Sequence, residues 1–111
     1  MENMEEISFN IITYSGQAKA NVMAAIDASR KFTGDKAEIK ALVTEARNHL
    51  KTAQESHFKV LSQYAKDQVN IIDPLYMHAE DQMMSAETFL DFANELIETN
   101  IALYELRSRL K

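Results

Sequence analysis

Residues 73–110 read DPLYMHAEDQMMSAETFLDFANELIETNIALYELRSRL, and this stretch decides the fold. Asp73 is a good N-cap, and Pro74 suits the first position of a helix because its missing N–H would be unpaired there anyway. Small and apolar residues then recur at spacings of three, four or seven, as they do on one face of an α-helix: Leu75, Ala79, Met83, Ala86, Leu90, Ala93, Ile97 and Tyr104. The pattern predicts one long amphipathic helix over residues 74–110.

Two further helices are predicted upstream, over residues 4–31 and 36–65. Asn3 with Glu6, and Asp35 with Glu38, have the spacing of a capping box at the two helix starts. Gly34 is placed to end the first helix in a left-handed conformation. The apolar stripes are Met4, Ile7, Ile11, Ala18, Val22 and Ala25 in the first helix, and Ile39, Leu42, Ala46, Leu50, Ala53, His57, Leu61 and Tyr64 in the second.

Composition and connection lengths favour an all-α fold. Two Gly and one Pro in 111 residues are too few for strands joined by tight turns. The short connection between the first two helices makes them antiparallel neighbours. The link over residues 66–72 is longer, and the third helix packs back against the other two. We therefore expect one domain over residues 1–111, an antiparallel three-helix bundle.

Some apolar residues lie off the three stripes, and they point to self-association. They are Ile12, Val43, Met84, Phe89 and Phe92. A three-helix monomer buries one stripe per helix, so a second apolar face indicates an oligomer. A broad core within a monomer is the alternative explanation.

Charge and composition exclude several classes of function. The formal net charge of −5 and the lack of a Lys/Arg run argue against binding to nucleic acid or to anionic membrane. The chain has no cysteine, which excludes disulfides and thiolate chemistry. No apolar run approaches the roughly 20 residues of a membrane span, and no signal peptide is evident at Met1. We expect a cytoplasmic protein without direct membrane insertion.

His78 is the residue with the clearest potential for chemistry. It lies four residues beyond Pro74, near a helix start, where the helix dipole favours an anion. A neutral imidazole is a nucleophile towards phosphorus. Asp81, Gln82 and Ser85 follow on the same face. Taken alone, a histidine in this place is more often a solvated or packing residue. As metal ligands, His78 and Asp81 would need further partners.

The other histidines and two nearby acidic residues have plainer interpretations. His49 is expected at the surface. His57 lies on the stripe of the second helix and is expected to be a hydrogen-bonded core histidine. Glu80 and Glu87 are expected on a solvated face.

Three motifs resemble one known family. Residues 78–85, His-Ala-Glu-Asp-Gln-Met-Met-Ser, are similar to His-Ala-Gln-Asp-His-Leu-Met-Thr, the active-site pattern of the lactose/cellobiose/chitobiose-type IIA proteins of the bacterial phosphotransferase system. Residues 15–19, Ser-Gly-Gln-Ala-Lys, resemble the Ser-Gly-Gln-Ala-Arg of that family. Gly34-Asp35, with Ala37, is similar to its Gly-Asp-Phe-x-x-Ala joint. The motifs occur in the family's order and extend over nearly the whole chain.

The resemblance implies a homotrimer of three-helix subunits, a nine-helix bundle. It implies that His78 accepts a phosphoryl group from the histidine phosphocarrier protein and passes it to a cysteine of a IIB component during disaccharide uptake. It also implies that Asp81 from three subunits meets at the trimer axis around Mg²⁺. The residues expected near the phosphate are Gln82, Ser85, His57 and Gln54.

The chain departs from the family pattern at three places. Gln82 replaces the second histidine of the active-site motif. Gln54 replaces the histidine of the family's Ala-His-x-x-Gln, and His57 stands where its glutamine would be. Glu80 replaces a glutamine. A helical interaction module or a regulatory paralogue that is not phosphorylated is therefore the alternative to a phosphocarrier.

Overall fold

The predicted all-α fold is confirmed by a computed structural model that describes residues 3–33, 35–67 and 73–110. It contains three helices: α1 (Met4–Arg30), α2 (Ala37–Asp67) and α3 (Pro74–Arg109). The described residues form no strand. α2 continues two residues beyond its predicted end, so Lys66 and Asp67 belong to the helix rather than to the following link. Gly34 lies outside the described residues, as do residues 68–72 of that link.

The predicted cap residues begin the three helices. Asn3 and Asp35 each accept a hydrogen bond from the backbone N–H two residues on, at 2.8 Å. Asp73 accepts from the N–H groups two and three residues on, at 3.0 and 3.2 Å. Within the described residues, neither Glu6 nor Glu38 returns the reciprocal bond of a capping box. The caps therefore rest on the Asn and Asp side chains alone.

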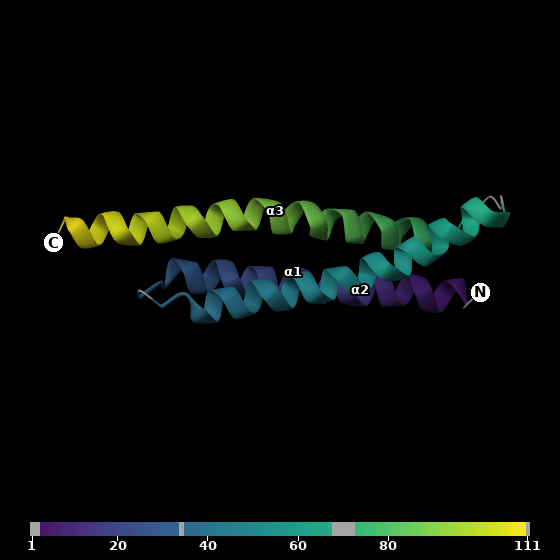
Figure 1. Cartoon of the computed structure of the whole chain (residues 1–111), viewed down its shortest axis with the longest axis horizontal. Helices are drawn as coiled ribbons and strands as arrows, with labels where there is room; N and C mark the ends of the chain where they lie inside the picture. The colour runs from purple at the N-terminus through teal and green to yellow at the C-terminus, as the bar shows by residue number, and fades with distance from the viewer. Residues whose placement is uncertain (1–2, 34, 68–72, 111) are drawn as a thin grey trace.

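The three helices form an elongated bundle of 64 × 20 × 17 Å in which α1 is the shared element (Figure 1). α1 packs along both α2 and α3, whereas α2 and α3 approach each other closely at few positions. α1 runs antiparallel to α2 and parallel to α3 (Figure 1). Because α2 and α3 have few direct contacts, any residue pair that joins them contributes strongly to holding the two helices in place relative to each other.

The core consists largely of the predicted stripes, with a shift near the end of α2 and another at the start of α3, where Tyr76 rather than Leu75 is buried. Ile11, Ala46 and Ala79 are fully buried, as expected. In the last turns of α2, however, Val60 is buried, and the predicted Leu61 and Tyr64 are 46% and 41% exposed. An α-helix drifts relative to a strict 3.5-residue stripe, so the contact line moves to another row of side chains over a helix this long.

The outward side of α3 carries a second apolar stripe, which we call the outer face. Ile12, Val43 and Phe89 turn out to pack against the edge of the core, but Met84 and Phe92 are 60% and 70% exposed. Further exposed apolar residues continue the stripe along α3 at helical spacing: Met77, Leu96, Leu103, Leu106 and Leu110. Asp81 and Ser85 lie among them. A single chain leaves this face uncovered.

Replacing Gly16 by alanine should stabilise the chain. Gly16 lies inside α1, and a Cβ atom built there meets nothing within 4 Å. Glycine in an exposed helix interior costs about 1 kcal/mol relative to alanine, so Gly16→Ala should raise the free energy of unfolding by about that amount. Urea unfolding measures it, with the exposed neighbour Gln17→Ala as a control expected to change little. A loss of stability in Gly16→Ala would contradict the open surroundings.

Candidate functional site

His78 is the fifth residue of α3, and its side chain is exposed to solvent. It makes no hydrogen bond or ion pair with any residue that the structure describes. Asp73 holds the start of the helix by accepting from the N–H groups of Leu75 and Tyr76. The first amides of α3 are therefore occupied by the cap and are not free to bind an anion. What remains for an anion at His78 is the helix dipole itself.

A positively charged lysine side chain lies one turn along α3 from His78. The Lys19 ammonium on α1 donates to Oε1 of Gln82 at 3.4 Å, and this contact is partly buried. Because Gln82 follows His78 by four residues, the two side chains project from the same side of α3. The contact thus brings a positive charge from another helix towards the histidine. Sequence reasoning included Lys19 only as the last position of a motif and gave it no role.

Asp81 and Ser85 extend the exposed surface around His78 along the outer face. Both are exposed and follow His78 by three and seven residues. No three His, Asp or Glu side chains of the described residues gather into a possible metal site. Within one chain Asp81 is therefore a single carboxylate, and a metal ion there would require carboxylates from other copies.

His57 and Glu80 join α2 to α3. Nε2 of His57 lies 2.7 Å from Oε2 of Glu80, so the ring N–H donates to the carboxylate. Their side chains are only 16% and 33% exposed. The imidazole also stacks against the ring of Tyr76, with centroids 6.1 Å apart and an interplanar angle of 9°. His57 is thus hydrogen-bonded as expected, whereas the prediction that Glu80 belongs to a solvated face is wrong.

Tyr76 is buried beside this pair, and its hydroxyl has no hydrogen-bond partner among the described residues. Burial and, secondarily, the negative charge of Glu80 raise the pKa of Tyr76 to about 12. The phenol is therefore kept neutral in the folded chain well beyond its ordinary range.

The wild-type chain should lose stability between about pH 10 and pH 12 because of Tyr76, and Tyr76→Phe should remove this loss. The unfolded chain loses the phenolic proton near pH 10 and the folded chain only near pH 12, so the unfolded state binds fewer protons in this window and stability falls as pH rises. Phenylalanine has no such proton. At pH 7 the variant should be unchanged or more stable by about 1 kcal/mol, because a buried hydroxyl without a partner is removed. Urea unfolding at pH 7 and pH 11 tests both.

Tyr104→Phe is the matched comparison at pH 7. The Tyr104 hydroxyl donates to the carbonyl of Thr33 at 3.3 Å, so its removal should cost stability. A Tyr76 variant that loses as much as the Tyr104 variant would show that the Tyr76 hydroxyl has a partner after all.

The remaining predicted site residues lie apart from His78 within one chain. Gln54 is exposed and lines a hollow between α2 and α3 together with Leu50, Glu87 and Leu90. That hollow is roughly 14–18 Å further along α3 than His78, at 1.5 Å per residue. The structure therefore places Gln82 one turn and Ser85 two turns from His78 on the same side of α3, but it places Gln54 elsewhere and engages His57 with Glu80.

His49 is not the surface residue that was expected. Its side chain is 25% exposed, lies 3.5 Å from Glu45 one turn back in α2, and stacks on Tyr14 of α1 with ring centroids 5.9 Å apart. Like His57, it is held between an acidic and an aromatic side chain.

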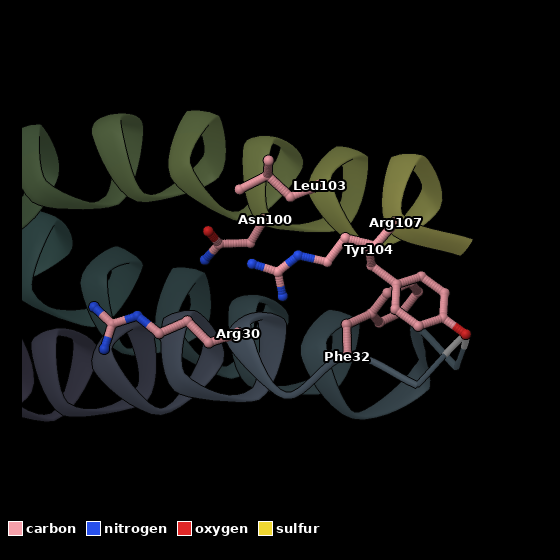
Figure 2. Close-up of a pocket in the computed structure, with 6 residues that line it drawn as sticks. All are labelled: Arg30, Phe32, Asn100, Leu103, Tyr104 and Arg107. Carbon is pink, nitrogen blue, oxygen red and sulfur yellow. The ribbon is translucent and has the colours of Figure 1, made fainter. Parts of the chain in front are cut away.

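A second hollow lies at the opposite end of the bundle (Figure 2). Its lining includes Arg30, Phe32, Asn100 and Arg107, and its volume is about 260 Å³. In Figure 2, Arg107 reaches back towards Asn100, whereas Arg30 extends away from Phe32 along α1. The two guanidinium groups do not converge on one point. The hollow lies roughly 33 Å from His78 along α3, at 1.5 Å per residue, and is separate from the site.

The fold is that of a sugar-phosphotransferase IIA protein. The chain superposes on a solved structure described as "Crystal Structure of the PTS Cellobiose Specific Enzyme IIA from Bacillus anthracis" with a TM-score of 0.85 and 27% sequence identity. The match covers 95% of this chain and 94% of that one. Two relatives come from Bacillus subtilis (strain 168). A lichenan-specific phosphotransferase enzyme IIA component is 33% identical, covering 94% of this chain and 89% of its own. An oligo-beta-mannoside-specific EIIA component is 30% identical, covering 85% and 84%.

Residues 6–100 match the family model described as "PTS system, Lactose/Cellobiose specific IIA subunit". The chain belongs to this family. It is a phosphotransferase system component, and the components of this family carry phosphoryl groups in sugar uptake. Membership implies interaction with a phosphocarrier and with IIB components. None of the described helices is long and apolar enough to cross a membrane.

Proposed function

We propose that His78 accepts a phosphoryl group from the histidine phosphocarrier protein and passes it to a cysteine of a IIB component during uptake of a disaccharide. One observation carries this assignment. Of the three histidines, His78 is exposed and without a described side-chain partner, whereas His49 and His57 are half-buried and each lies beside a carboxylate. A carrier must reach the reacting atoms of two other proteins in turn, which requires an exposed imidazole.

The transfer exchanges one N–P bond for another. The unprotonated ring nitrogen of His78 forms a bond to phosphorus while the donor's N–P bond breaks and its electron pair returns to the donor nitrogen. In the second step the sulfur of the IIB thiolate forms the new bond to phosphorus, and the His78 nitrogen recovers its pair. Lys19, through its contact with Gln82, supplies positive charge near the phosphoryl group. The start of α3 contributes roughly 0.3–1 kcal/mol towards holding the anion.

The active assembly that we propose is a homotrimer in which the outer faces of three α3 helices meet. An exposed stripe of this length is rare on a monomer and typical of a subunit contact. Asp81 lies on the stripe, so three copies would bring three carboxylates together at the axis. Oxygen ligands of this kind suit Mg²⁺, which would compensate their charge. Gln54, which lies further along the bundle, and His57, which contacts another side of α3 than His78, would approach a phosphate only from another subunit or after movement.

A regulatory paralogue that is not phosphorylated remains the second candidate, because Gln82 stands where the family's active-site motif has its second histidine. A neutral amide is a weaker donor to a phosphoryl group than a charged imidazole. In either role we expect the protein to work in the cytoplasm, where its partners carry phosphate.

Incubation with phosphoenolpyruvate, enzyme I and the histidine phosphocarrier protein separates the two candidates. If this chain is a phosphocarrier, it should gain one acid-labile phosphate per chain, measured by intact-protein mass. The lichenan-specific relative from Bacillus subtilis is the positive control. If that control is labelled and this chain is not, the protein is not a carrier.

A further inference from the structure

We infer that His57 and Glu80 are a positioning pair that orients the first turns of α3, and with them His78, for phosphoryl transfer. This inference rests on the proposed function of His78. It assigns His57 to the scaffold of the site, acting through Glu80, rather than to the phosphate itself.

The pair joins the two helices of the bundle that have the fewest close contacts with each other. α1 packs along both other helices, but α2 and α3 approach each other closely at few positions. The hydrogen bond from His57 to Glu80, at 2.7 Å, joins these two helices directly, and the stacking of His57 on Tyr76 adds a second contact between them. A hydrogen bond to a charged group in partly buried surroundings is stronger than a neutral one at the surface.

Helix geometry connects the pair to His78. Glu80 follows His78 by two residues, which is about 200° around the helix, so Glu80 turns towards α2 while His78 faces solvent. On another side of α3, Gln82 is held by Lys19 of α1. The two tethers together restrict rotation of this part of α3 about its own axis. A rotation would redirect His78 relative to an incoming phosphohistidine.

The two residues also depart together from the family pattern. That pattern has glutamine at both positions, and here one has become histidine and the other glutamate. The structure places these two departures in direct contact, as a donor ring and an acceptor carboxylate. Both positions therefore take part in one contact between α2 and α3.

The test is a double-mutant cycle on the whole protein, with His57→Phe, Glu80→Leu and the double variant. Phenylalanine keeps a ring beside Tyr76 but cannot donate to Glu80, and leucine cannot accept from His57. Each single variant should slow phosphorylation of His78 at saturating histidine phosphocarrier protein by about tenfold, since a small misplacement of a reacting group is costly, and should leave the donor concentration for half-maximal rate unchanged. The double variant should be no slower than either single variant, because both remove the same contact. His49→Phe is the matched control, because it breaks a histidine–glutamate contact within α2 and keeps a ring beside Tyr14.

Hydrogen exchange of residues 76–85 gives a readout that needs no phosphoryl chemistry. Exchange should rise in His57→Phe and in Glu80→Leu, and rise no further in the double variant. If the wild type is phosphorylated and His57→Phe matches it in rate and exchange, the inference is overturned while the carrier function stands. If the double variant is slowed by the product of the two single effects, the two residues act independently and the pair is wrong. If neither the wild type nor any variant takes up phosphate, the carrier proposal fails. The hydrogen-exchange pattern then decides alone for or against the pair.

Discussion

His78→Ala should abolish phosphoryl transfer while leaving the fold intact. Removing the nucleophile of a transfer reaction lowers the rate by roughly 10³-fold or more. The side chain is exposed and makes no hydrogen bond or ion pair with the described residues, so the free energy of unfolding should change by less than about 0.5 kcal/mol. Phosphate incorporation in the enzyme I assay, with urea unfolding beside it, measures both quantities.

His49→Ala is the control for the removal of an imidazole. It should lose some stability, because His49 stacks on Tyr14, but it should still take up phosphate. A His78→Ala protein that is labelled as fast as the wild type would refute the assignment. A His78→Ala protein that unfolds would mean that the side chain has a structural contact in the assembly.

A charge on the outer face of α3 should break the trimer into monomers. Phe92 and Leu103 are 70% and 47% exposed in a single chain, and we propose that three copies bury them together. Phe92→Glu with Leu103→Glu would place six carboxylates in that contact, and an unpaired charge is costly to bury. Light scattering at micromolar concentration should then change from the mass of three chains to that of one.

Two comparisons make the trimer experiment specific. Ala41→Glu adds a charge at an exposed position near the start of α2 and should leave the trimer intact. Asp81→Asn should remove any dependence of trimer stability on magnesium or chelator, because the three carboxylates that need a cation are gone. A wild-type mass of one chain, with helicity retained, would contradict the proposed assembly.

The fold was predictable because its determinants are local. Asn3, Asp35 and Asp73 cap helices through bonds that span two or three residues, and each apolar stripe is written in one helix. The shift to Val60 near the end of α2 was not predictable, since it depends on how a long helix drifts against its neighbours. The motif around His78 indicated the region of the site, but the role of His78 came from the family resemblance rather than from the residue pattern.

The contacts of the site were beyond reach of the sequence because they join residues far apart in the chain. From the sequence, Glu80 looks like an ordinary surface carboxylate, and only the packing of α2 against α3 brings His57 into contact with it. Lys19 likewise belongs to a motif 63 residues away from Gln82, and only the parallel packing of α1 and α3 brings them together. Neither contact follows from periodicity, which gives the buried face of a helix but not the side chains that face each other across two helices.

Proton–phosphorus correlation by NMR on the freshly phosphorylated wild-type protein tests the central claim most directly. The spectrum identifies both the histidine and the ring nitrogen that carry the phosphate. The account predicts a single phosphorus signal coupled to the ring protons of His78. A phosphorus signal coupled to the ring of His49 or His57 would contradict it.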